Sequence, residues 1–99
     1  MSYVLIRQKV QNYAKWKNAF DESAEKNRRP YGSQGGYIFR DADDPDTVSV
    51  LLKWNSAENM QRFLDNMKTD EMQQLLKAAG VLGPPLAMHV FSEAEETLF

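Results

Sequence analysis

Few side chains in this sequence are of the types that carry out chemistry. The only histidine is His89, whose unperturbed pKa lies near neutrality, so it can act as a general acid or base. The alternative is a hydrogen-bonded packing residue. The absence of cysteine excludes thiolate nucleophiles, disulfides and sulfur-ligated metals, and a single histidine excludes every two-histidine metal motif. We therefore expect a site without metal or organic cofactor.

Aromatic and sulfur-containing side chains supply a candidate binding site. Trp16 and Phe20 lie four residues apart on one predicted helix, and Trp54 ends a predicted strand. Together they could line a cleft that stacks a planar ligand, with Met88 as an adaptable neighbour. The alternative is that they are ordinary core residues at helix and strand spacing.

Charged and glycine-rich segments suggest three further sites. Arg7 and Arg40 could bind an anionic substrate group, although a strand arginine more often covers apolar surface with its stem. Residues 41–46 contain four aspartates, but the sixth position is not glycine and the twelfth is Leu52, so the EF-hand pattern fails and a solvated hairpin turn is expected. The glycine-rich residues 32–36 precede a strand instead of a helix, which argues against a dinucleotide motif.

The composition bounds the class of protein. The chain has 99 residues, 42% of them hydrophobic and 26% charged, with 12 Lys and Arg against 14 Asp and Glu. This length predicts one domain over residues 1–99. The net charge of -2 argues against binding to nucleic acid or to an anionic membrane, and no apolar run is long enough to span a bilayer. We expect a cytoplasmic protein.

Hydrophobic periodicity predicts an α+β, ferredoxin-like βαββαβ fold, in which helices cover one face of a four-stranded antiparallel sheet. Three basic residues, Lys26, Arg28 and Arg29, fall in the last turn of the first helix, where they complement its dipole. The first half is expected to contain a strand at 3–10, a helix capped by Asn12 and stopped by Pro30, and a hairpin with strands at 37–40 and 47–54. The second half is expected to contain a helix capped by Ser56, a helical pattern that restarts at Thr69 and has its C-cap at Gly80, and a strand at 86–91.

Alternation along the strands divides their side chains into two faces. The face expected under the helices is nearly all aliphatic and comprises Val4, Ile6, Val10, Ile38, Val48, Val50, Leu52, Trp54, Leu86, Met88 and Val90. The outer face carries several aromatics, which a sheet facing only water would not need. A second copy is the simplest cover, so we expect a homodimer through Tyr3, Leu5, Tyr37, Phe39, Leu51, His89 and Phe91.

Three stretches of the sequence resemble one known family. They are YAKWKNAFD at 13–21, YGSQGGYIFRDADDPDTVSVLLKW at 31–54 and AAGVLGPP at 78–85. They are similar to the dimeric α+β barrel proteins related to antibiotic biosynthesis monooxygenases, with a likeness that covers residues 3–91. The resemblance implies a homodimer with its sheets face to face and a cleft in each subunit between sheet and helices. Members include cofactor-free oxygenases of aromatic polyketides, haem-degrading enzymes, isomerases and many proteins of unassigned function.

The enzymes of this family tend to use an asparagine in the first strand, a tryptophan at the end of the third strand and, where haem is bound, a histidine on a helix. Trp54 matches the tryptophan position. The first strand has Gln8 as its only amide, and His89 lies in the last strand, so haem degradation is not expected. Gln8 could polarise a carbonyl group, although alternation places His89 on the opposite face from Trp54.

Two functions follow. The first is a cofactor-independent monooxygenase-like or cyclase/isomerase-like enzyme that acts on an aromatic or hydrophobic metabolite, with Trp16 and Trp54 stacking it and Gln8 and His89 as weak catalytic candidates. The alternative is a non-catalytic dimeric module that binds a small ligand or supports an assembly. An RNA-binding RRM domain has the same element order, but residues 47–54 lack its internal aromatics and the chain lacks a basic surface.

Overall fold

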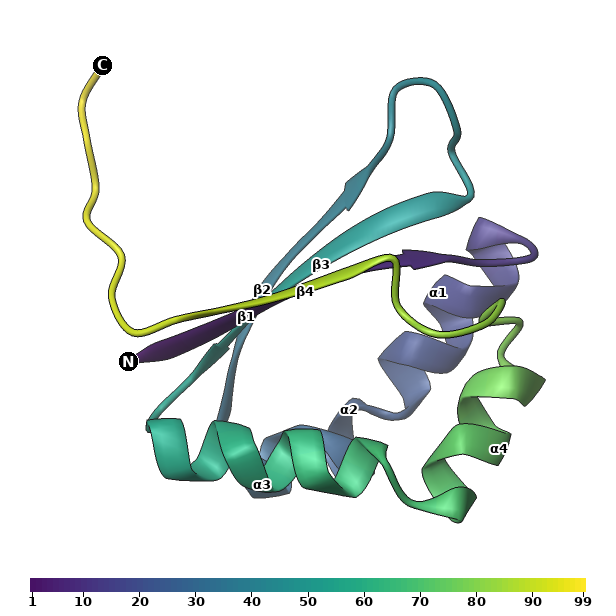
Figure 1. The fold of residues 1–99 in the computed structure, drawn as a ribbon, viewed down its shortest axis with the longest axis horizontal. Coiled ribbons are helices and arrows are strands. Elements are labelled where there is room, and N and C mark those ends of the chain that lie inside the picture. The colour runs from purple at the N-terminus through teal and green to yellow at the C-terminus, as the bar shows by residue number, and fades with distance from the viewer.

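A computed structural model describes the whole chain, residues 1–99 (Figure 1). Its elements are β1 (Ser2–Lys9), α1 (Tyr13–Glu22), α2 (Ala24–Asn27), a 3-10 turn (Arg29–Tyr31), β2 (Ser33–Arg40), β3 (Thr47–Trp54), α3 (Ala57–Met67), α4 (Asp70–Ala78) and β4 (Ala87–Phe91). No helix is both long and apolar enough to cross a membrane.

The four strands form one antiparallel sheet in the order β2-β3-β1-β4. The central strands β1 and β3 pair along their whole length, from Ser2 opposite Trp54 to Lys9 opposite Thr47. Figure 1 shows the helices on one side of this sheet, while the segment after β4 leaves on the other side. The predicted α+β, ferredoxin-like fold is therefore confirmed, with one sheet face left uncovered by the chain.

Side-chain caps fix where three helices begin. The side chains of Asn12, Ser56 and Thr69 each accept a hydrogen bond from the backbone N–H three residues ahead, as expected for N-caps. At the other end, Gly80 follows α4 with a φ of 92°, a left-handed conformation that glycine adopts without strain. The caps predicted at Asn12, Ser56 and Gly80 are confirmed, and Thr69 begins the helix whose pattern the sequence shows restarting there.

The first helical segment differs from the prediction, because it does not continue to Pro30. It breaks at Ser23, whose hydroxyl donates to the Phe20 carbonyl over 2.9 Å and accepts from the Arg28 guanidinium over 3.1 Å. Serine competes with the helix in this way by bonding to nearby backbone groups. The break turns the short α2 and the following 3-10 turn back toward β2.

The core lies between the inner face of the sheet and the helices. Trp54 is fully buried and its ring centroid lies 4.4 Å from that of Phe63 on α3. The expected inner face is confirmed on the central strands but not on β4 and the residue before it. There Leu86, Met88 and Val90 are each about half exposed, at 54%, 51% and 56%. The reason is that β4 is an edge strand that no helix covers.

The Asp44 carboxylate accepts three hydrogen bonds in the hairpin loop between β2 and β3. Asp44 accepts hydrogen bonds from the Lys9 ammonium at 2.7 Å, from the Thr47 hydroxyl at 2.8 Å and from the Asp46 backbone N–H at 3.0 Å. These donors favour the charged form and lower the pKa of Asp44 to about 2, with the Lys9 hydrogen bond as the largest cause. The solvated aspartate turn expected from the sequence is thus a turn organised around Asp44.

Replacing this residue, Asp44→Asn, is expected to make the protein less stable near neutral pH but not at pH 2. A carboxyl whose folded pKa lies below the unfolded value of about 3.9 stabilises the fold above that value, and the effect disappears as pH falls toward 2. Thermal melts of wild type and variant from pH 7 to 2 should therefore converge. The exposed neighbour variant Asp43→Asn is the control, and an equal loss in both variants would contradict the assignment to Asp44.

Candidate functional site

Two cavities lie on the helix side of the sheet, and both are bordered by Phe20, Arg28, Val50 and Leu52. The first, which we term the α1–β2 cavity, has a volume of about 520 Å³ and lies between α1, α2 and the edge strand β2. The second, the α1–α4 groove, has a volume of about 1710 Å³ and lies between α1, α4, the inner face of β1 and the loop before β4. Ligand pockets typically have volumes of about 300–1,000 Å³, so both have room for a small organic molecule.

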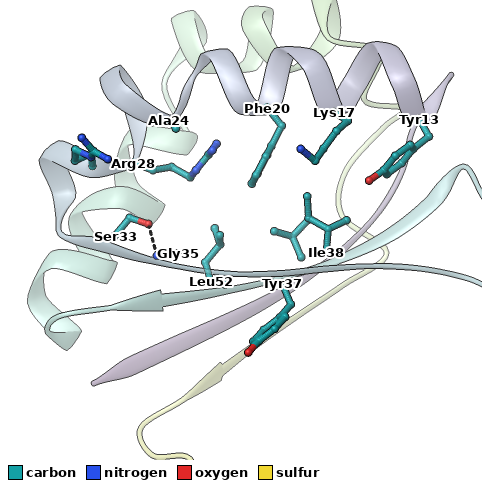
Figure 2. Close-up of a pocket in the computed structure, with 13 residues that line it drawn as sticks. Tyr13, Lys17, Phe20, Ala24, Arg28, Ser33, Gly35, Tyr37, Ile38 and Leu52 are labelled. Atoms are coloured by element: carbon teal, nitrogen blue, oxygen red, sulfur yellow. Dashed lines mark hydrogen bonds between the residues drawn. The ribbon is translucent and has the colours of Figure 1, made fainter.

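The α1–β2 cavity combines apolar walls with cationic side chains. Figure 2 shows the Arg28 guanidinium and the Lys17 ammonium on either side of the Phe20 ring, with the Tyr13 hydroxyl farther along α1. The opposite wall is formed by inward-facing residues of β2 and β3, including Ile38. No acidic side chain lines this cavity, although the Lys17 ammonium pairs with the neighbouring Asp21 carboxylate.

The rim of the α1–β2 cavity on β2 is irregular. The pairing of β2 with β3 shifts register between Ser33 and Gly36, and Gly35 has a φ of 80°. A Cβ at Gly36 would lie 1.8 Å from the Leu51 carbonyl oxygen, so only glycine fits there. The glycine-rich segment therefore forms a β-bulge, a feature found often beside active sites.

The α1–α4 groove is the more apolar of the two. Trp16 and Phe20 form its α1 wall, with ring centroids 5.0 Å apart at an interplanar angle of 32°. Met88 borders the groove from β4, and Met72 borders it from α4. Three of the four residues predicted to bind a ligand, Trp16, Phe20 and Met88, therefore line one groove.

Trp54 lies apart from this group. Its side chain is 0% exposed and borders neither cavity, because Val4 and Phe63 are packed with it in the same core cluster. Its indole N–H has no hydrogen-bond acceptor. In this structure Trp54 is enclosed by protein, so no surface of its ring is available to stack a ligand.

The two weak catalytic candidates lie on different faces of the sheet. Gln8 borders the α1–α4 groove, but its amide N–H₂ donates to the backbone carbonyls of Leu82 and Gly83 over 3.4 and 3.3 Å. His89 is exposed on the outer face and stacks on Phe91, with ring centroids 6.3 Å apart. No proton transfer between these two groups is possible across the sheet.

The arginines suggested as anion-binding residues are also outside the cavities. Arg7 forms an ion pair with Asp41 on the outer side of the sheet. Arg40 donates to the Pro45 carbonyl and lies over the Tyr13 ring, with its Cζ atom 3.8 Å from the centroid. Both cations are engaged within the protein.

Solved structures show the same arrangement of elements. Candidate antibiotic biosynthesis monooxygenases from Bordetella bronchiseptica and Caulobacter crescentus match with TM-scores of 0.70 and 0.69 at 16% and 19% identity, over 95% of this chain and over 97% and 90% of theirs. SnoaB, a cofactor-independent oxygenase from Streptomyces nogalater, matches with a TM-score of 0.68 at 18% identity, over 98% of this chain and 95% of its own. The chain has the antibiotic biosynthesis monooxygenase fold. No protein-family model and no curated protein sequence matches it.

Within this monooxygenase fold, Arg28 is only 9% exposed. The sequence placed it with Lys26 and Arg29 in the last turn of a helix, where cations complement the dipole, and its burial was not predicted. The signal was present, because Arg28 continues the four-residue spacing of Trp16, Phe20 and Ala24 on the apolar stripe. Burial lowers the pKa of Arg28, and the nearby Asp21 carboxylate opposes part of that shift.

Proposed function

We propose that the protein is a homodimer that binds a small, flat, mostly apolar molecule between α1 and the sheet. The observation that carries this proposal is the α1–α4 groove, an open space of about 1710 Å³ that is lined by the half-buried Phe20 ring and by Trp16, which is 5% exposed. The Phe20 ring provides the main aromatic contact for a planar ligand. Met88 and Met72 add adaptable apolar contacts on the other walls.

Binding is better supported than catalysis by the placement of the polar groups. Gln8 is the nearest amide, but its N–H₂ is shared among backbone carbonyls of the loop before β4, so it is a poor donor to a substrate carbonyl. His89 lies on the opposite face of the sheet, where α1 and α4 do not reach. A general base must come within hydrogen-bond reach of its substrate.

The homodimer is proposed from the uncovered face of the sheet. Tyr37, Phe39 and Phe91 on this face are 59%, 53% and 43% exposed, and Tyr37 stacks on Phe39 with ring centroids 6.2 Å apart. Leu5 on β1 pairs with Leu51 on β3 and with His89 on β4. These side chains connect the aromatic residues of β2 with those of β4 across the uncovered face. A patch of this kind is typical of a protein interface, and two-fold symmetry makes a second copy its natural partner.

The ligand proposal is tested with the neutral fluorescent probe N-phenyl-1-naphthylamine. We expect its emission to rise on binding, and Phe20→Ala to weaken its affinity about tenfold, because one wall of the groove is removed. Phe99→Ala is the matched control, since Phe99 is fully exposed at the chain end. An unchanged affinity in Phe20→Ala, or no binding by wild type, would reject the groove as a ligand site.

A second candidate function is favoured by the fold shared with SnoaB, a cofactor-independent oxygenase. In this case the groove would bind a phenolic polycyclic substrate and the protein would accelerate its reaction with dioxygen. An oxygen electrode distinguishes the two functions: dithranol, a hydroxyanthrone, should consume oxygen faster with the protein than without it only if the chain is an oxygenase.

A further inference from the structure

Arg28 is a buried cation without a carboxylate partner. Its side chain is 9% exposed, its one side-chain hydrogen bond is donated to the Ser23 hydroxyl at 3.1 Å, and its Cζ atom lies 3.6 Å from the Phe20 ring centroid. The other two cations that line the α1–β2 cavity are paired: Lys17 with Asp21, and Arg29 with Glu25 at 3.1 Å. Arg28 therefore supplies the unpaired charge in this cavity.

A guanidinium in this position stays charged, because arginine does not lose its proton in proteins. Its five N–H donors exceed the single acceptor that the chain provides. Burying a charge without a directly paired counter-charge is unfavourable, and the Phe20 ring and the nearby Asp21 carboxylate offset only part of that cost. An anion bound beside Arg28 would complete both the charge balance and the hydrogen bonding.

The geometry of the cavity selects the kind of anion. The planar fork of a guanidinium matches the two oxygens of a carboxylate. Only one unpaired cation is present, which fits a singly charged carboxylate better than a doubly charged phosphate. Beyond Arg28, the inward-facing side chains of Ile38, Val50 and Leu52 form an apolar wall against which a ring can lie.

We infer that the α1–β2 cavity binds an aromatic carboxylic acid, with its carboxylate on Arg28 and its ring against Ile38, Val50 and Leu52. This inference rests on the proposed function in placing a ligand between α1 and the sheet, and it assigns a second ligand site in the α1–β2 cavity, which shares Phe20 with the α1–α4 groove. In this inference the Ser23 hydroxyl, at the break between α1 and α2, orients the Arg28 guanidinium toward the bound carboxylate.

The test compares 1-naphthoate with its neutral counterpart 1-naphthamide by isothermal titration calorimetry. Wild type should bind the carboxylate about 10-fold to 100-fold more tightly than the amide, as expected for charge-assisted hydrogen bonds. Arg28→Gln should abolish this preference and leave amide binding within about twofold. Arg62→Gln is the matched control and should keep the preference, because Arg62 is exposed on α3 and borders neither cavity.

Each outcome decides the inference. Equal affinity of wild type for the two compounds, or a preference that survives Arg28→Gln, would overturn it, and binding of the neutral naphthylamine probe would leave the proposed function intact. Failure of every naphthalene compound to bind would reject both. If Arg28→Gln does not fold, Arg28→Lys keeps the charge without the planar fork, and its preference for naphthoate must fall below that of wild type.

Discussion

Phe39→Asp is expected to convert the proposed dimer into a monomer of 11.4 kDa. Phe39 is 53% exposed on the edge strand β2 and stacks with Tyr37 on the uncovered sheet face. In a dimer closed over this face the new carboxylate would be buried without a partner, at a cost of about 3–5 kcal/mol. That penalty corresponds to a loss of roughly 100-fold or more in dimer affinity. Phe91→Asp should act in the same way, because Phe91 lies on the same face opposite Tyr3.

Light scattering after size exclusion at micromolar concentration measures the mass directly. Two controls test whether dissociation requires a charge at this position. Phe39→Leu keeps an apolar side chain and should stay dimeric. Asn18→Asp adds a negative charge on the exposed side of α1 and should also stay dimeric. The melting temperature of Phe39→Asp should fall and lose its dependence on protein concentration, because dimerisation no longer adds to stability. A wild-type mass near that of one chain would refute the interface.

The elements of the fold follow from local sequence signals. Ser56 and Thr69 each precede an apolar stripe at helical spacing, and both begin helices as predicted. The alternation in residues 47–54 places Val48, Val50 and Leu52 on the buried face, because the strand repeat of two residues leaves no other choice. These signals involve residues close together in the sequence, so they can be identified without the tertiary structure.

The candidate site depended on tertiary contacts that periodicity does not encode. Trp16 and Trp54 both belong to apolar stripes, but α3 covers Trp54 with Phe63 while Trp16 borders an open groove. The difference arises from where each helix crosses the sheet, which no pattern within one element determines. Arg28 shows the converse, since it is buried in line with the apolar stripe, whereas a charged side chain is usually exposed.

The same burial makes Trp54 the residue on which stability should depend most. Trp54→Ala is expected to lower the free energy of unfolding by about 3–5 kcal/mol, because it removes a large buried side chain and leaves a cavity beside Phe63. Domains of this size are typically stable by about 5–15 kcal/mol, so the variant should be marginal. Urea denaturation followed by circular dichroism measures the change as a shift in midpoint at a similar slope.

The milder variant Trp54→Phe separates stability from ligand binding. It keeps a ring in the core and removes an indole N–H that has no acceptor, so its stability loss should be well below that of Trp54→Ala. Since Trp54 borders neither cavity, N-phenyl-1-naphthylamine should bind Trp54→Phe with wild-type affinity. A folded Trp54→Phe protein with clearly weakened probe binding would show that the ligand reaches Trp54, as the resemblance to the monooxygenases implied. Unchanged binding would leave Trp16 and Phe20 as the aromatic surface that the ligand contacts.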